Sequence, residues 1–342
     1  MKEEYGMKEQ FSALVVDKTA DGEVHAAVRE QTLADLPEGS VTIRVAYSGV
    51  NFKDALACSA DGHIVKTYPF VPGIDLSGIV AASDDPRFTP GQRVLVTGYE
   101  LGVSHFGGLS EYARVPGDWI VPVPEGLSLR DAMAFGTAGL TAAMAVERLE
   151  RHGLRPGDGP VLVTGASGGV GSLAIAMLAQ LGCEVVAASG KPELGDALRR
   201  LGAASVVSRD DWRPERPRAL DKQRWAGVVD VCGGGILAAA VASTKYGGAV
   251  AATGMTAGGD WPASVFPFIL RGITLYGIDS VYAPHDLRLK LWSRMASDWR
   301  DAVRFDGWVR ELRLEDVPAY TRTMREGGIS GRAIVRLSGD GE

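Results

Sequence analysis

A glycine-rich turn between a buried strand and an apolar helix is the feature that most constrains this fold. Val161–Val163 is a short apolar run of the kind that forms a buried strand, and Val170–Leu181 has the length and composition of a buried helix. Between them the glycines follow a G-x-x-G-x-x-G spacing, at Gly165, Gly168 and Gly171. A strand, a glycine cluster and a helix in this order predict a dinucleotide site. The alternative is a turn that only packs a helix on a sheet.

Each glycine of this turn stands at a position where a side chain would hinder the predicted structure. Gly165 and Gly168 let the backbone turn sharply and approach a pyrophosphate, and Gly171 lets the helix pack close to the strand. The amides at the start of the helix face the anion, and the helix dipole favours it.

The end of the next strand indicates which dinucleotide is bound. NAD sites usually carry an acidic residue roughly 20 residues after the turn, which accepts from the ribose hydroxyl. Here the segment 184–191 ends in Ser189, Gly190 and Lys191, with no acid at its tip, and Arg209 follows the third strand. A 2′-phosphate would be held by hydroxyl, amide and cation, so NADPH is the predicted cofactor. The alternative for both cations is that they are solvated surface charges.

The pattern of predicted secondary structure changes near residue 128. Before it, short strands alternate with Gly/Pro turns and indicate a compact β domain; they are Phe11–Val16, Val41–Val50, Ile74–Ala81 and Arg93–Thr97. A capping sequence at Ser128 then starts a helix that runs to about Glu150. Beyond it, strands and helices alternate, which predicts a doubly wound parallel sheet of the Rossmann type and therefore an α/β fold. The predicted strands here are Val161–Val163, Glu184–Ala188, Ser205–Val207, Val228–Val231, Ala249–Ala252 and Thr274–Ile278, and a final strand covers Ala333–Leu337.

Charge and cysteine content exclude several classes of protein. The chain has 36 basic and 42 acidic residues and no basic block, so we expect no nucleic-acid partner. Its first residues are charged rather than apolar, so we expect no signal peptide there. No stretch reaches the ~20 apolar residues of a membrane span, so we expect no membrane-spanning helix. Three scattered cysteines, Cys58, Cys183 and Cys232, form no CxxC pair, and a reducing cytoplasmic location is expected.

The chain resembles the medium-chain dehydrogenase/reductase superfamily, on its zinc-free quinone-oxidoreductase-like branch. The segments Gly49–Asp54, Val71–Gly78 and Thr164–Gly171 carry this resemblance. A more specific resemblance is to acrylyl-CoA reductases of the YhdH/AcuI type. It extends through Gly107–Arg114, Gly136–Gly139, Ser208–Asp210, Pro267–Arg271 and Gly277–Ser280, and covers about residues 11–337.

This resemblance implies a GroES-like β-barrel domain, residues 1–129 and 287–342, around a Rossmann NADP-binding domain, residues 130–286. It also implies a homodimer that pairs the edge strand at Thr274–Ile278. The implied activity is NADPH-dependent reduction of an activated carbon–carbon double bond, with acrylyl-CoA as the preferred substrate. Hydride goes to the β carbon, and the enolate is then protonated at the α carbon. An NADPH quinone or enone oxidoreductase is the alternative, and a non-catalytic NADPH-binding protein is the third possibility.

No metal site is expected. Zinc enzymes of the superfamily use a Cys after the second long strand and a His-Glu pair after Pro-Gly, whereas this chain has Asn51 and Ile74-Asp75 there. A four-Cys structural zinc site is also missing from the sequence, which has only three cysteines.

The resemblance assigns roles to the segment after Gly49. Asn51 would donate a hydrogen bond to the enolate oxygen, or only hold a turn. Phe52 would pack on the nicotinamide or the substrate, or belong to the core. Lys53 would donate a proton or contact CoA phosphate, and Asp54 would fix the loop or cap a short helix. Related enoyl reductases have a tyrosine proton donor downstream, but Gly62 and His63 stand there, so water is a further proton source.

The remaining cofactor contacts also come from the resemblance. The pyrophosphate would be lined by Ser167, Gly168, Gly169 and Val170. Met255 would face the nicotinamide, and Ser280 and Ile269 would contact the cofactor, with plain core burial as the alternative for Ile269. For CoA phosphates, Arg288 and Lys290 are further candidates.

Overall fold

The computed structural model describes residues 7–212, 218–303 and 307–338. Contacts within the chain divide it into two compact units. The first contains Met1–Thr137, Val281–Ala296 and Asp306–Glu342, and the second contains Ala138–Ser280 and Ser297–Phe305. The first unit is therefore built from segments that lie far apart in the sequence, whereas the second is nearly continuous.

The first unit is mainly antiparallel sheet. A seven-stranded sheet follows the order β14-β15-β3-β4-β5-β7, with β6 paired to β3, and β1 and β2 form a separate pair. The strands are β1 (Gln10–Lys18), β2 (Val24–Thr32), β3 (Val41–Val50), β4 (Asp75–Ser83), β5 (Arg93–Thr97), β6 (Tyr112–Val115), β7 (Val121–Pro122), β14 (Val309–Leu312) and β15 (Arg332–Arg336). Its helices are α1 (Phe52–Ala57), α7 (His285–Ala296) and α8 (Val317–Arg325).

The pairing of β15 with β3 brings a late segment of the chain beside an early one. The register is antiparallel and matches Ala333 to Val50 and Val335 to Ser48. The alternating residues Val41, Ile43 and Val45 of β3 enter one apolar core, and almost all other residues of the strand are buried as well. The end of β3, the start of α1 and the start of β15 consequently meet.

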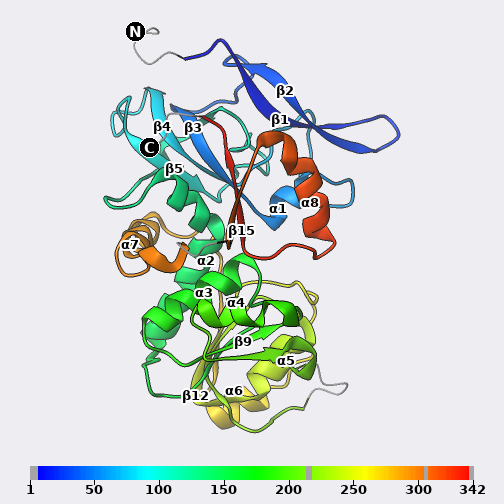
Figure 1. Cartoon of the computed structure of the whole chain (residues 1–342), viewed down its shortest axis with the longest axis vertical. Coiled ribbons are helices and arrows are strands. Elements are labelled where there is room, and N and C mark those ends of the chain that lie inside the picture. Colours follow the sequence, from blue (N-terminus) through cyan, green and yellow to red (C-terminus); the bar gives the residue numbers. More distant parts are fainter. Residues whose placement is uncertain (1–6, 213–217, 304–306, 339–342) are drawn as a thin grey trace. The chain divides into compact units, whose positions relative to one another are not determined.

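The second unit is a six-stranded parallel sheet in the order β10-β9-β8-β11-β12-β13. Its strands are β8 (Val161–Val163), β9 (Val185–Ser189), β10 (Ser205–Ser208), β11 (Trp225–Asp230), β12 (Thr244–Ala252) and β13 (Thr274–Gly277). Its helices are α3 (Gly169–Gln180), α4 (Gly195–Arg200), α5 (Gly234–Ala242) and α6 (Phe266–Arg271). Figure 1 shows α3 and α4 on one side of this sheet and α5 and α6 on the other. The strand order reverses between β8 and β11, which is where such sheets bind ligands.

Helix α2 (Leu129–His152) contains the boundary between the units and is interrupted at Gly136. The backbone there has φ 52° and ψ −154°, a conformation open almost only to glycine. The N-terminal end follows the predicted capping sequence, because the Asp131 N–H donates to Ser128 Oγ at 2.9 Å.

The doubly wound parallel sheet predicted from the sequence is confirmed, as is the edge position of β13. The predicted strands at 41–50, 93–97 and 161–163 agree with β3, β5 and β8 at both ends. The sequence does not predict strand β2, because this strand is at most half-buried along its length and lacks a strong apolar alternation. Helix α5 is likewise not delimited by the sequence, since it begins in glycines and is apolar all round.

Candidate active site and cofactor cradle

The glycine-rich turn forms a tight cradle at the carboxyl end of β8. Gly165 has φ +59°, and a Cβ atom on Gly171 would lie only 2.8 Å from the Gly165 carbonyl carbon. Gly168 is the N-cap of α3, so Gly169 and Val170 open the helix with N–H groups that have no partner inside it. Ser167 lies in the turn that precedes the cap. This geometry fits a pyrophosphate.

Asp230, at the carboxyl end of β11, ties the turn to its neighbouring loop. It is fully buried; its Oδ1 accepts from Thr164 Oγ1 at 2.7 Å, and its Oδ2 accepts from the Gly233 N–H at 2.7 Å. The Val231 N–H donates in turn to Thr164 Oγ1 at 3.0 Å. Burial raises the pKa of Asp230, and these donors oppose the shift. The sequence signal for Asp230 is an acidic residue at the end of a buried strand, and it lies outside the motifs named above.

The residues predicted to bind a 2′-phosphate gather at the ends of β9 and β10. Ser189 is paired with Ser208 across the two strands, and Ser189 Oγ accepts from the Lys191 N–H at 3.0 Å. A Cβ atom on Gly190 would lie 2.9 Å from the Arg209 guanidinium carbon, so Arg209 lies directly against the Gly190 backbone. Arg209 also has an exposed ion pair with Asp210, at 3.7 Å. The structure thus brings Ser189, Gly190 and Arg209 together.

Three further predicted cofactor residues of the second unit differ in exposure. Met255 is 72% exposed and Ile269 is 69% exposed, so the alternative of core burial for Ile269 is wrong. Ser280 is buried, and its Oγ accepts from Thr141 Oγ1 at 2.7 Å.

In the first unit, Asn51 is the N-cap of α1 and its side-chain amide is held on both sides. Its Nδ2 donates to Asp75 Oδ2 at 2.7 Å and makes a longer contact of 3.4 Å with the Gly49 carbonyl oxygen. Its Oδ1 accepts from Arg332 Nη1 at 3.1 Å. One amide N–H is therefore fully used by Asp75, and the second has only the weak contact to Gly49.

The neighbours of Asn51 on α1 have different environments. Phe52 is 52% exposed, so the alternative of core packing is wrong for it. Lys53 is half-buried. Asp54 is fully buried, and its carboxylate accepts from the backbone N–H groups of Asn51 (2.7 Å) and Ile74 (2.9 Å). Burial raises the pKa of Asp54 to about 7, and the charge of Asp75 adds to the rise.

Asp75, Thr137 and Arg332 complete this cluster, and the sequence analysis assigned none of them to the active site. Thr137 follows the break in α2; its N–H donates to Asp75 Oδ2 at 2.9 Å and its hydroxyl donates to Asp75 Oδ1. Arg332 Nη2 lies 3.8 Å from Asp75 Oδ2. Burial raises the pKa of Asp75 and lowers that of Arg332, while the attraction between the two charges opposes both shifts. Asp75 and Thr137 each have a sequence signal, their places in the Val71–Gly78 and Gly136–Gly139 segments, whereas Arg332 has none.

Arg288, considered for CoA phosphates, has a structural role instead. It is 1% exposed and its guanidinium donates to the carbonyl oxygens of Thr97 (2.8 Å), Val281 (2.7 Å) and Ala283 (3.1 Å). It also lies 4.3 Å from the ring centroid of Tyr99. The CoA interpretation of Arg288 is therefore wrong, because the group is closed off from a ligand.

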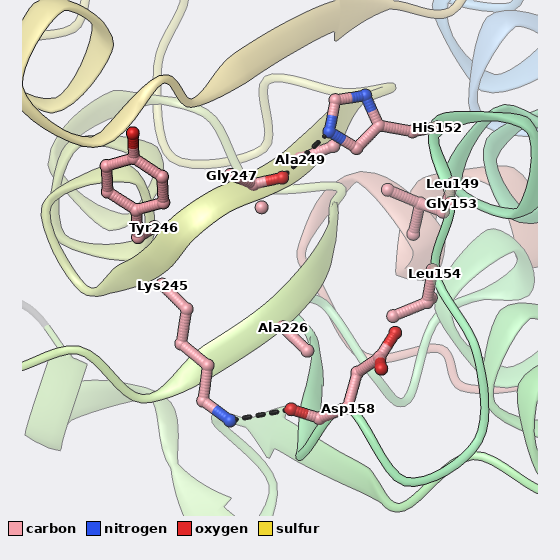
Figure 2. Close-up of a pocket in the computed structure, with 11 residues that line it drawn as sticks. Leu149, His152, Gly153, Leu154, Asp158, Ala226, Lys245, Tyr246, Gly247 and Ala249 are labelled. Atoms are coloured by element: carbon pink, nitrogen blue, oxygen red, sulfur yellow. Dashed lines mark hydrogen bonds between the residues drawn. The ribbon is translucent and has the colours of Figure 1, made fainter.

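A separate cavity of about 320 Å³ lies at the amino ends of β11 and β12. Figure 2 shows Lys245 donating to the Asp158 carbonyl oxygen on one side, at 2.7 Å, and His152 bonded to the Gly247 carbonyl oxygen on the other, at 2.9 Å. It contains none of the predicted site residues. The cofactor cradle, at the carboxyl ends of the strands, is a different region of the sheet.

Two family profiles match the chain. The one described as alcohol dehydrogenase GroES-like domain matches residues 37–125, and the one described as zinc-binding dehydrogenase matches residues 169–297. Together they cover more than half of the sequence.

Close relatives match over nearly the whole length. The chain is 51% identical to the putative quinone oxidoreductase YhfP of Bacillus subtilis, over 97% of this chain and 100% of that protein. It is 49% identical to the acrylyl-CoA reductase AcuI of Ruegeria pomeroyi, over 96% of this chain and 99% of that protein.

Solved structures of such relatives share the fold. The yhdH oxidoreductase of Salmonella enterica, in complex with NADP, has a TM-score of 0.92 and 45% identity, over 96% of this chain and 100% of that one. The Bacillus subtilis yhfP structure, with NAD bound, has a TM-score of 0.93 and 51% identity, over 96% and 100% of the two chains.

The name of the second profile implies zinc, and the residues of this chain do not fit it. At the places where zinc relatives would have ligands, the Asn51 amide bridges Asp75 and Arg332, and the Arg332 guanidinium already supplies a positive charge beside Asp75. Within residues 7–212, 218–303 and 307–338, no group of three or more His, Cys, Asp or Glu is arranged to hold a metal ion.

Profiles, relatives and topology agree with the fold expected from the sequence, a GroES-like domain joined to a Rossmann domain. The chain belongs to the medium-chain dehydrogenase/reductase family.

Proposed function

We propose that this protein is an NADPH-dependent reductase of activated carbon–carbon double bonds, with acrylyl-CoA as its substrate and propionyl-CoA as its product. The observation that carries the cofactor assignment is the anion-receptive edge of the parallel sheet, where the glycine cradle and the Arg209–Gly190 contact follow successive strands. The substrate assignment is supported by the acrylyl-CoA reductase that shares 49% of its sequence over 99% of its length.

The described residues fit NADPH. The amides of Gly169 and Val170, with Gly165, Ser167, Gly168 and Gly171 around them, would hold the pyrophosphate. The cation of Arg209, the hydroxyl of Ser189 and the side chain of Lys191 would hold the 2′-phosphate, next to Gly190. Met255, Ile269, Ser280 and Phe52 are the remaining proposed contacts. When bound, NADPH supplies the hydride for the β carbon of the substrate.

The task of this chain in the reaction is to orient the thioester and stabilise the enolate oxygen. The second N–H of the Asn51 amide is the donor that we assign to this oxygen, because the first is used by Asp75. Lys53, half-buried on the first turn of α1, is the protein group that we assign to donate the proton at the α carbon. Asp54, which is buried and holds two backbone N–H groups, acts by fixing the turn that carries Asn51.

We also propose a homodimer formed through β13. This strand is the last in its sheet, so its outer edge is available to a second copy. The helix that precedes it, α6, exposes Phe266, Ile269 and Leu270, and its N-cap residue Val265 is exposed as well. An apolar face beside an open edge favours a protein partner.

For location we propose the cytoplasm, supported by three cysteines that are all unpaired in the structure. Of the helices in the described part of the chain, none combines the length and the apolar composition of a membrane span.

The test is the rate of NADPH oxidation by the purified protein with acrylyl-CoA, crotonyl-CoA and 1,4-benzoquinone. We expect acrylyl-CoA to be the best substrate, with NADPH preferred to NADH. Rapid turnover of the quinone alone would favour the second candidate function, which the 51% identical putative quinone oxidoreductase supports. NADPH binding without turnover of any substrate would indicate a non-catalytic binding protein.

A further inference from the structure

The cluster around Asn51 contains an ion pair that the proposed function does not use. Asp75 is 0% and Arg332 is 4% exposed, and their charged groups lie 3.8 Å apart. A buried ion pair rarely adds net stability, since both charges lose their hydration. We propose that Arg332 is a positioning residue that acts through Asn51 and fixes the orientation of its amide. This inference rests on the proposed function, in which Asn51 stabilises the enolate oxygen.

The chemistry of the two neighbours allows only one orientation of the amide. A guanidinium has donors and no acceptor, and an ionised carboxylate has acceptors and no donor. Arg332 therefore faces Asn51 Oδ1, and Asp75 faces Nδ2, at 3.1 Å and 2.7 Å. Reversing the amide would put donors against donors and acceptors against acceptors. The pair thereby keeps the Nδ2 group on one side of Asn51.

The guanidinium of Arg332 is itself held rigidly. Its Nε donates to the Ala134 carbonyl oxygen at 2.9 Å, and its terminal nitrogens reach the carbonyl oxygens of Val50 and Met133, each at 3.3 Å. These partners come from the end of β3 and from α2, while Arg332 begins β15. A planar fork can bind several fixed acceptors at once, whereas a lysine ammonium cannot reproduce this arrangement.

Two glycines provide independent support, because both leave room for the pair. A Cβ atom on Gly49 would lie 2.8 Å from Asp75 Oδ2 and 3.1 Å from Arg332 Nη2. A Cβ atom on Gly136 would overlap Asp75 Oδ2 and lie 2.8 Å from Arg332 Nη2. The break in α2 at Gly136 also delivers both donors of Thr137 to Asp75. Strand β3 and helix α2 therefore each have a glycine where a larger residue would contact the Asp75–Arg332 pair.

The test is a double-mutant cycle on the full chain with N51A, R332K and the combined variant, measured as kcat with acrylyl-CoA and as the NADPH dissociation constant. We expect R332K to lower kcat on the order of tenfold to 100-fold, as small displacements of a catalytic group do. The dissociation constant should change less than about twofold, since the cradle lies in the other unit. In the N51A background, R332K should have almost no further effect on kcat.

R288K is the matched control, because Arg288 is an equally buried guanidinium of the same unit whose bonds go to carbonyl oxygens of Thr97, Val281 and Ala283. We expect it to lower the melting temperature while kcat stays within about twofold. If R332K does not fold, R332Q replaces it, because a glutamine amide can both donate and accept and no longer imposes one orientation on Asn51 from this side. Independent, multiplying effects of N51A and R332K on kcat would overturn the proposal, as would an equal loss of kcat in R288K.

A crystal structure of the R332K variant separates this proposal from the proposed function. If the wild-type protein reduces neither acrylyl-CoA nor the quinone, the proposed function fails, and the orientation of Asn51 still decides the role of Arg332. We expect Asn51 Oδ1 to lose its guanidinium donor in the variant and the Asn51 side chain to move from its wild-type position. An Asn51 side chain that superimposes on the wild type would show that Arg332 does not position it.

Discussion

At the scale of single residues, the proposed cofactor site depends on the absence of a side chain at Gly190. Arg209 can lie against the backbone of Gly190 because any Cβ atom there would meet its guanidinium. The same region lacks the acidic residue that would bind a ribose hydroxyl and repel a phosphate. A relative with 51% identity was solved with NAD bound, so the cofactor preference of this chain is a useful quantity to measure.

The first residue-scale prediction concerns Lys191. Lys191→Ala should weaken NADPH binding by about 1–3 kcal/mol, because a charge-assisted hydrogen bond to the 2′-phosphate is lost. NADH, which has no such phosphate, should bind almost unchanged. Fluorescence titration with both nucleotides measures this difference. Lys222→Ala, at an exposed position of the same unit, is the control. Equal weakening of both nucleotides would remove Lys191 from the proposed phosphate site.

The second residue-scale prediction concerns Asp54 and pH. Burial raises its pKa to about 7 in the folded protein, from an ordinary value of 3.8 for an aspartate. Between about pH 4 and pH 7 the folded state therefore holds a proton that the unfolded chain has released. The free energy of unfolding should fall as pH rises through this window, by up to about 1.4 kcal/mol per pH unit, and level off above it.

Denaturant unfolding at a series of pH values measures this slope. Asp54→Asn should flatten it by about one proton, whereas Asp260→Asn, at an exposed position, should leave it as in the wild type. A wild-type slope that survives in Asp54→Asn would assign the titration to another group.

At the scale of elements, α2 shows how a local break can serve a distant contact. The helix stops at Gly136 with a positive φ, and the next residue turns both of its donors to Asp75 on β4. The kink has a backbone conformation that favours glycine, and it is buried. A Cβ atom at Gly136 would also contact Asp75 and Arg332, so the local geometry of the kink depends on these two residues as well as on the helix.

Gly136→Ala should destabilise the protein by about 2–5 kcal/mol, from backbone strain together with overlap on the ion pair. Gly153→Ala separates the two causes, because Gly153 also has a positive φ of +119° but nothing lies within 4 Å of its would-be Cβ. We expect the control to lose about 1–2 kcal/mol from strain alone. Denaturant unfolding gives both values, and similar losses would show that the overlap with Asp75 and Arg332 is relieved at little cost.

Elements with a strong local pattern could be read from the sequence, and contacts between distant residues could not. The alternation in 41–50 and the glycine spacing in 165–171 each follow from a few neighbouring residues, and β3 and the cradle formed as expected. The Gly49–Asp54 segment identifies Asn51, but its partners Asp75 and Arg332 come from two other strands. An isolated arginine late in the sequence has no local feature that distinguishes a buried guanidinium from a solvated one, and Arg332 was therefore missed.

At the scale of the whole molecule, the proposed dimer makes a direct prediction. Leu270→Asp, at a position 56% exposed on α6, should convert the dimer to a monomer, because a charge would enter the apolar contact beside β13. Light scattering after size-exclusion chromatography measures the mass. Leu289→Asp, on α7, serves as the control at another exposed leucine and should leave the dimer intact. A monomeric wild-type protein would refute the dimer, and a dimeric Leu270→Asp variant would refute this interface.

The interleaved order of the two units has a consequence for biosynthesis. Ribosomes make Asp75 early and Arg332 late, with the nearly continuous second unit in between. A nascent chain therefore carries a carboxylate destined for the interior long before its counter-ion exists. Most of the nucleotide-binding unit, residues 138–280, has been synthesised before Arg332 is, so this unit can begin to fold first. The other unit closes last, when translation delivers the strand that neutralises Asp75.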